Sequence, residues 1–156
     1  MSKIEVDPMH IDTFHSLTQP EAPIKILYAE DDADDYDFFE LALESMGGQF
    51  ELLHAISGQS ALACLHEAKR NKSLPDLVVL DYNMPGVNGM EALDLIRRDT
   101  ELSAIPAVIF TTGHTERMFA LRKVPVLRKV DTMAEMKRQI RGMLSIAGFA
   151  NLAPYK

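Results

Sequence analysis

The residues Leu77-Val78-Val79-Leu80-Asp81 decide the fold, because four apolar side chains in succession lead directly into a carboxylate. A strand that is apolar on both faces is typical of a parallel sheet with helices on each side. The runs at 24–29 (IKILYA) and 107–110 (AVIF) have the same character. Between these runs apolar residues recur at helical spacing, so the sequence predicts strands and helices in alternation.

Five strands and five helices are expected in one α/β domain. The strands are expected at residues 24–29, 50–56, 77–80, 107–110 and 124–127. The helices are expected at 32–47, from 57 onward, at 88–98, within 111–122 and at 132–147. Because strand–helix–strand crossovers are right-handed, this alternation favours a doubly wound parallel sheet with helices on both faces. We expect the domain at 23–147, with an N-terminal tail at 1–22 and a C-terminal tail at 148–156.

The composition argues against several classes of protein. The 156 residues hold 16 lysines and arginines against 23 aspartates and glutamates, which gives a formal charge of −7. A nucleic-acid binder would carry a basic patch, so no nucleic-acid partner is expected. No apolar run approaches the length of a membrane span, and the N-terminus does not resemble a secretory signal. The single cysteine, Cys64, fits a reducing compartment, so we expect a cytoplasmic domain without a membrane contact.

The chemistry is expected at the carboxyl ends of the strands, where open α/β sheets bind their ligands. Glu30 and Asp31 follow the first strand, Asp81 the third, Thr111 the fourth and Lys129 the fifth. Two carboxylates about 4 Å apart repel by roughly 4 kcal/mol at an effective dielectric near 20, so a proton or a cation must offset the repulsion. Oxygen ligands beside open positions suit Mg²⁺, which often completes its shell with a phosphoryl oxygen. The sequence contains neither GxGxxG nor GxxxxGK[ST], which argues against a dinucleotide or a nucleoside triphosphate.

Four features in this order resemble the receiver domain of bacterial response regulators. They are ILYAEDD at 26–32, VVLDYNMPGVNG at 78–89, IFTTG at 109–113, and a lysine after the fifth strand. The resemblance covers about residues 23–147 and implies a flavodoxin-like receiver fold with strand order 2-1-3-4-5. The size of the chain and the stretch TTGHTE also resemble the single-domain regulators that serve phytochrome-type kinases.

The resemblance implies a role for each matching acid. Asp81 would accept a phosphoryl group from a sensor histidine kinase or a histidine phosphotransfer protein. Asp31 would ligate Mg²⁺ directly together with Asp81, Glu30 would act through a bound water, and the backbone carbonyl of Asn83 would supply a further ligand. The new charge would then switch a protein–protein contact, and the only catalysis would be self-phosphorylation and self-dephosphorylation.

The resemblance also implies roles for the later motifs, where the sequence departs from the family pattern. Thr111 would hydrogen-bond the phosphoryl group, and Lys129 would form an ion pair with it. Val130 stands where a proline normally follows the lysine, so Arg128 is an alternative for the cation; a compact ammonium favours Lys129. Val126 stands at the aromatic switch position. The segment leading to the last strand is short, so the fourth helix is expected to be truncated.

Plainer explanations stay open for several of these residues. Asp31 could cap a helix, Asp81 could cap a turn, and Lys129 could be a solvated charge at the sheet edge. His54 is expected to be a packing residue, and His114 a loop residue. The acids that follow Asp31 are expected to complement the helix dipole rather than to act as ligands: Asp32, Asp34, Asp35 and Asp37.

Two other functions compete with the phosphorylation switch. A degenerate receiver could act as a constitutive protein-binding module, which the missing proline and aromatic residue favour. A magnesium-dependent phosphohydrolase would need a second acid two residues after its nucleophile, where this chain has Asn83. A homodimer through the fourth helix, fifth strand and fifth helix is a further expectation from the family.

Overall fold

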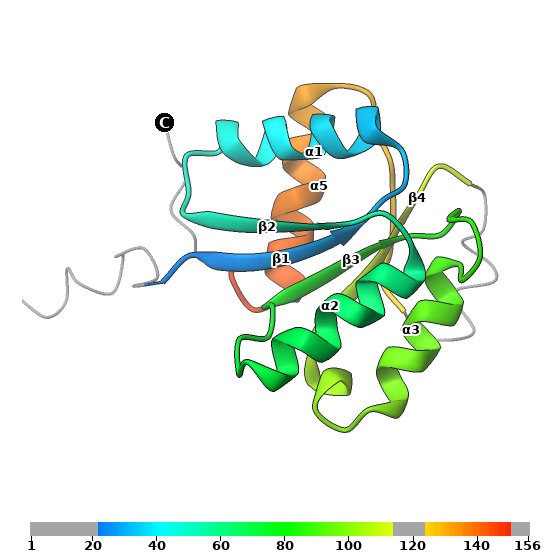
Figure 1. The fold of residues 1–156 in the computed structure, drawn as a ribbon. Coiled ribbons are helices and arrows are strands. Elements are labelled where there is room, and N and C mark those ends of the chain that lie inside the picture. The colour runs from blue at the N-terminus through cyan, green and yellow to red at the C-terminus, as the bar shows by residue number, and fades with distance from the viewer. Residues whose placement is uncertain (1–21, 114–123, 151–156) are drawn as a thin grey trace, which may run out of the picture.

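The computed structural model describes residues 22–113 and 124–150, and a five-stranded parallel sheet lies at its centre (Figure 1). The sheet has the strand order β2-β1-β3-β4-β5, which confirms the predicted topology. The strands are β1 (Ile24–Ala29), β2 (Phe50–Ala55), β3 (Leu77–Asp81), β4 (Ala107–Thr111) and β5 (Val126–Arg128). The helices are α1 (Ala33–Ser45), α2 (Gly58–Arg70), α3 (Gly89–Arg98) and α5 (Met133–Ile146), with a short 3₁₀ turn, η3, at Leu102–Ala104.

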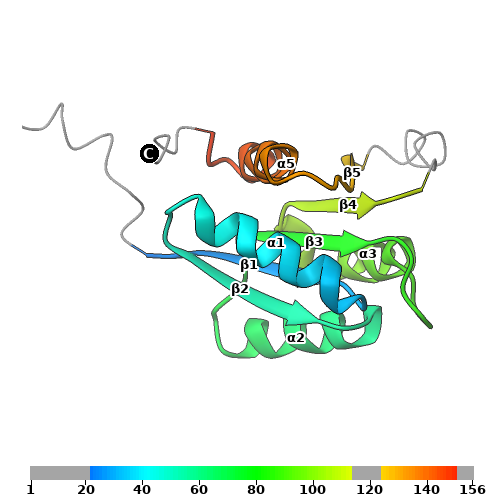
Figure 2. The same cartoon turned by 90° about the horizontal axis from the view of Figure 1, so that it is seen from above.

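Helices cover both faces of the sheet, as predicted for strands that are apolar on both sides. Figures 1 and 2 show α2 and α3 on one face, and α1 with α5 on the other. Alternate residues of β1 divide between the two cores, because successive side chains of a strand point to opposite faces. Ile26 and Tyr28 pack with α1 and α5, whereas Leu27 and Ala29 pack with α2 and α3.

The two central strands β3 and β4 are buried along their whole length. Both end in a polar residue, Asp81 and Thr111, and each of these side chains remains buried. Burial of a polar group without a partner costs free energy, so these two positions direct attention to the carboxyl edge of the sheet.

Side-chain caps set the start of each helix. Asp32, Ser57, Asn88 and Thr132 each accept a hydrogen bond from the backbone amide three residues later. Such caps stabilise a helix by typically about 1 kcal/mol. The cap of α1 is thus Asp32 rather than Asp31, and Ser57 forms a reciprocal capping box with Ser60.

The predicted elements agree with the structure to within two residues, with two corrections. The strand predicted at 50–56 ends at Ala55, and the side chain of Ile56 is exposed. The strand predicted at 124–127 begins only at Val126, after Pro125, which has no amide hydrogen to donate to the sheet. The η3 turn was not predicted, and the predicted fourth helix lies outside the described residues. In the part of the chain that the structure describes, no helix has the length and apolar character needed to cross a membrane.

Candidate functional site

Three carboxylates meet at the carboxyl edge of the sheet. Oxygen atoms of Glu30, Asp31 and Asp81 all lie within 4.8 Å of one another. The strands β1 and β3 are neighbours, with Ala29 paired to Leu80, so the residues that end them must lie side by side. Glu30 and Asp81 are only 1% and 4% exposed, whereas Asp31 is open to solvent. The predicted acidic residues therefore form one cluster, in which Glu30 and Asp81 are buried and Asp31 is exposed.

Glu30 is held by hydrogen-bond donors on both oxygens. Its Oε1 accepts from the backbone amide of Asp32 at 3.1 Å, and its Oε2 accepts from the Tyr28 hydroxyl at 3.0 Å and from the Lys129 ammonium at 2.5 Å. Burial, and then the negative charge of Glu30, raise the pKa of Tyr28 far above its usual range, so Tyr28 is a neutral donor. Glu30 thus has its charge compensated and its orientation fixed.

His54 supports the same residue from the backbone side. Its Nε2 donates to the carbonyl oxygen of Glu30 at 2.8 Å, because a carbonyl can only accept. The His54 ring stacks on Tyr36 with centroids 3.7 Å apart and planes 14° apart. The prediction of a packing residue thus describes only part of its environment, since the imidazole also holds the backbone at the end of β1.

Asp81 is a buried acid with few donors of its own. Its Oδ1 accepts from the backbone amide of Asn83 at 3.3 Å, and its Oδ2 lies 3.6 Å from the Lys129 ammonium. Burial raises the pKa of Asp81 to about 7; the positive charge of Lys129 opposes this shift and the negative charge of Glu30 adds to it. A further cation beside the Asp81 carboxylate would therefore stabilise its charged form.

Lys129 brings the positive charge into the cluster. Its backbone amide donates to the Thr111 carbonyl at 2.9 Å, which seats it directly after β5 and beside the end of β4. Its ammonium lies 2.8 Å from Asp35 as well as close to Glu30 and Asp81, and its side chain is only 9% exposed. Burial alone would lower the pKa of Lys129, but the hydrogen bonds to Asp35 and Glu30 raise it overall. Of the two candidate cations, Lys129 is the one whose ammonium reaches the acids, and Arg128 is exposed.

The neighbouring loops complete the edge of the site. Thr111 is buried, and its Oγ1 accepts from the amide of Gly113 at 3.2 Å. After β3 the chain turns at Gly86, which has a φ of +74°, and returns so closely that a Cβ on Gly89 would lie 2.3 Å from the Asp81 carbonyl oxygen. Val126, at the position of the aromatic switch, is half-buried against the α2/α3 core. The predicted loop residue His114 lies outside the described residues.

Two participants were missed in the sequence. The sequence explains Asp35 by the helix dipole, but its carboxylate pairs with Lys129. An acid in the first turn of a helix already has a local explanation, and nothing in the sequence shows that Asp35 faces Lys129. Tyr28 was counted only as part of an apolar strand, and nothing in that pattern reveals where its hydroxyl points.

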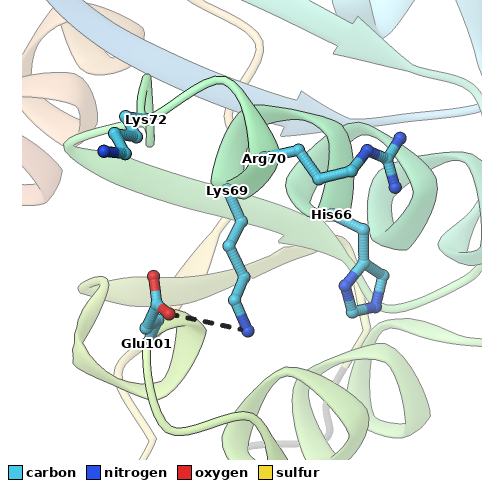
Figure 3. A pocket seen from close by; sticks show the side chains of 5 residues that line it. All are labelled: His66, Lys69, Arg70, Lys72 and Glu101. Carbon is cyan, nitrogen blue, oxygen red and sulfur yellow. Dashed lines mark ion pairs between the residues drawn. The ribbon is translucent and has the colours of Figure 1, made fainter.

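A pocket of about 440 Å³ lies at the C-terminal end of α2 (Figure 3). The helix ends where the chain returns to the start of β3, so this pocket lies at the end of the sheet opposite to the acidic cluster. It is lined by His66, Lys69, Arg70, Lys72 and Glu101. The Lys69 ammonium lies 2.8 Å from Asp99 and 3.8 Å from Glu101. Asp99 in turn accepts from two amides that begin η3, and the hydrogen bond from Lys69 lowers the pKa of Asp99 to about 2. These contacts tie α2 to the end of α3, which is a structural role.

Comparison with known proteins shows which family this chain resembles. The family model of the response regulator receiver domain matches residues 26–128. Response regulator Rcp1 of Synechocystis sp. is 33% identical over 96 residues, which cover 60% of this chain and 65% of Rcp1. Protein PilH of Pseudomonas aeruginosa is 35% identical over 92 residues, which cover 59% of this chain and 70% of PilH. The chain thus spans just under two thirds of the length of Rcp1.

Solved structures of response regulators have the same fold. The phosphorylated cyanobacterial phytochrome response regulator RcpA superposes with a TM-score of 0.71 at 26% identity, over 83% of this chain and 96% of RcpA. The Mn²⁺-bound form of Rcp1 gives a TM-score of 0.67 at 29% identity, over 79% of this chain and 93% of Rcp1. With two thirds of its residues matched by the family model and its strands in the same order, this chain belongs to the receiver-domain family of two-component response regulators.

Proposed function

We propose that this protein is a phosphorylation switch that accepts a phosphoryl group on Asp81. Receiver domains take phosphoryl groups from histidine kinases or histidine phosphotransfer proteins. The observation that carries the proposal is the position of Asp81, a buried carboxylate with an oxygen within 4.8 Å of oxygens of two further acids and 3.6 Å from one ammonium. A carboxylate so placed lies beside one cation and beside two acids that could share a second cation with it.

The donor set fits a divalent cation. Receiver domains bind Mg²⁺ or Mn²⁺, and three carboxylate oxygens within 4.8 Å of one another are ligands of the hard type that Mg²⁺ prefers. We assign Asp31 and Asp81 as direct ligands, with the backbone carbonyl of Asn83 as a third. Glu30 would act through a bound water, as the resemblance implies, and its two oxygens already accept from three donors. When bound, the ion neutralises charge that develops on the phosphoryl oxygens.

The protein side chains then have separate tasks. One oxygen of Asp81 forms a bond to phosphorus as the bond from phosphorus to the histidine nitrogen breaks, and that nitrogen keeps the electron pair. Lys129 moves from its carboxylate partners to a phosphoryl oxygen. The Thr111 hydroxyl donates to another phosphoryl oxygen, which draws its loop toward the site. The output is a changed protein contact. A cytoplasmic location and a homodimer through the fourth helix, β5 and α5 stay predictions.

The test is intact-mass measurement after incubation with Mg²⁺ and a small phosphodonor such as acetyl phosphate. We expect the wild-type protein to gain the mass of one phosphoryl group, and the gain to disappear with a chelator or in Asp81→Asn. Asp34→Asn is the matched control, because it removes an exposed aspartate of α1 and should leave the gain intact. No gain in the wild-type protein, with small donors and with phosphorylated kinases alike, would refute the proposal.

A second candidate function is a constitutive binding module, and the packing of Val126 favours it. Val126 has no aromatic ring that could swing with Thr111, and its side chain lies half-buried against the α2/α3 core. The two candidates differ in one measurement, which is the affinity for a captured partner with and without phosphorylation. Equal affinities would support the binding module, and a change that Asp81→Asn abolishes would support the switch.

A further inference from the structure

The ammonium of Lys129 is shared among three carboxylates that are not equivalent. Glu30 and Asp35 lie at hydrogen-bond distance, at 2.5 and 2.8 Å, whereas Asp81 lies at 3.6 Å. The cation therefore rests on the side of the cluster away from the proposed phosphoryl acceptor. An element far away in the sequence supplies the second short contact, because Asp35 lies in the first turn of α1 and Lys129 follows β5.

The two short contacts differ in what holds each acid. Glu30 is 1% exposed and has donors from Tyr28 and from the Asp32 amide, so it stays in place wherever Lys129 goes. Asp35 is 46% exposed at its side chain, so water can replace the ammonium at little cost. The ion pair between Asp35 and Lys129 is thus the one that breaks when a stronger anion forms at Asp81.

We infer that Asp35 is a positioning residue, which holds the Lys129 ammonium in the unphosphorylated protein and competes for it with a phosphoryl group on Asp81. This inference rests on the proposed function of Asp81. It assigns to Asp35 a direction of effect: the aspartate favours the unphosphorylated state. Removing its charge should therefore strengthen the binding of a phosphoryl group or of an analogue of one.

The helix dipole does not account for this arrangement. Asp34 and Asp35 both lie in the first turn of α1 and both complement the dipole. Of the two, only Asp35 is turned toward the sheet edge, and among the described residues no hydrogen bond or ion pair of the Asp34 side chain is found. A variant at Asp34 therefore removes the same charge from the same helical turn without touching Lys129.

The experiment measures the affinity for beryllofluoride, an analogue of the phosphoryl group, in the presence of Mg²⁺. We expect Asp35→Asn to tighten this affinity roughly two- to fivefold, the range of a half-exposed ion pair, and Asp34→Asn to leave it unchanged. In a Lys129→Gln background, Asp35→Asn should have no further effect, because the ammonium for which it competes is gone. Asp35→Glu, which keeps the charge, should restore an affinity closer to that of the wild-type protein.

Two results would overturn the inference. One is an Asp35→Asn variant that binds the analogue no more tightly than Asp34→Asn, and the other is an effect of equal size in the Lys129→Gln background. A wild-type protein that neither binds the analogue nor gains a phosphoryl group would instead refute the proposed function. In that case a crystal structure of Asp35→Asn decides whether Asp35 holds Lys129: the ammonium should move toward Asp81, and an unchanged 3.6 Å separation would contradict the role.

Discussion

The ammonium of Lys129 lies 3.6 Å from the Oδ2 of Asp81, and the two side chains are 9% and 6% exposed. This separation is within the range of an ion pair but too long for a good hydrogen bond. The buried acid is therefore stabilised by the cation without being fully compensated by it. A divalent ion would compensate the remaining negative charge of the cluster.

Replacing Lys129 by alanine should separate two properties of the site. Mg²⁺ binding should persist, because the three carboxylates remain, while phosphoryl acceptance and the resulting signal should fall. The variant should also lose about 1–3 kcal/mol of unfolding free energy, because buried Glu30 loses a donor. Calorimetry with Mg²⁺, intact-mass measurement and denaturant unfolding report these three quantities.

The matched control for this variant is Arg128→Ala, which removes an exposed cation from the adjacent position. It should leave phosphoryl acceptance unchanged. A loss of acceptance in Arg128→Ala together with full acceptance in Lys129→Ala would move the role of the cation to Arg128.

The raised pKa of Asp81 predicts how stability depends on pH in the metal-free protein. With a pKa of about 7 in the folded state and 3.8 as the ordinary value, the folded state binds more protons than the unfolded state between these limits. The contribution of Asp81 to the free energy of unfolding is therefore largest below pH 3.8. It falls as pH rises from 3.8 to about 7, by up to about 1.4 kcal/mol per pH unit. Above about pH 7 the loss is complete.

Thermal unfolding in the presence of a chelator, at several pH values from roughly 4.5 to 8, tests this dependence of stability on pH. Asp81→Asn should be more stable than the wild-type protein at the upper end, and the difference should shrink as pH falls. Other carboxylates titrate in both proteins, so only the difference between the two curves reports Asp81. A difference that is constant with pH would show that the carboxylate is not strained by its burial.

The Tyr28 hydroxyl is predicted to stabilise the buried charge of Glu30. Tyr28→Phe keeps the ring, whose centroid lies 4.5 Å from that of Phe39, but removes the 3.0 Å hydrogen bond to Glu30. Hydrogen bonds to charged groups contribute about 1.5–3 kcal/mol, so the unfolding free energy should fall by about that amount. Denaturant unfolding measures the change directly.

Tyr36→Phe is the control, because it removes a hydroxyl from a half-buried tyrosine whose ring stacks on His54. Among the described residues, no hydrogen bond of the Tyr36 hydroxyl is found. It should therefore be close to neutral, and a loss of stability as large as that of Tyr28→Phe would remove the special role of Tyr28.

The fold could be predicted closely because its strongest signals are local. The apolar runs that became β1, β3 and β4 admit few alternatives, and each is followed by a polar residue that ends it at one edge of the sheet. The edge strand β5 was less well placed, because three residues beside a proline carry little pattern. Sequence reasoning thus succeeds where burial on both faces imposes the composition.

The candidate site could be predicted only in part, because contacts between distant side chains leave no pattern in a single sequence. Glu30, Asp31 and Asp81 could be predicted because they lie at or just after the ends of apolar strands. Asp35 was not, since an acid in the first turn of a helix already has a local explanation. Its partner Lys129 lies across the fold, and only the three-dimensional arrangement shows that the two side chains meet.

Gly89 links the acidic site to the helix that follows it. It is the first residue of α3, and a Cβ there would lie 2.3 Å from the carbonyl oxygen of Asp81 and 3.0 Å from its carbonyl carbon. These are backbone atoms that cannot rotate away, so Gly89→Ala must displace either the helix or the end of β3. We expect a loss of about 1–3 kcal/mol in unfolding free energy and a weaker affinity for Mg²⁺, because the displaced backbone carries Asp81.

Gly142→Ala makes the opposite prediction and serves as the control. Gly142 lies inside α5, and among the described residues no atom outside the local helix backbone comes within 4 Å of the position of an added Cβ. Alanine is favoured over glycine in a helix interior by about 1 kcal/mol, so this variant should be more stable, with its Mg²⁺ affinity unchanged. If Gly89→Ala were as stable as the wild-type protein and bound Mg²⁺ equally well, the close approach of α3 to Asp81 would not constrain the site. The opposite signs of the two variants would show that the backbone contact, rather than the loss of glycine itself, keeps Asp81 in position.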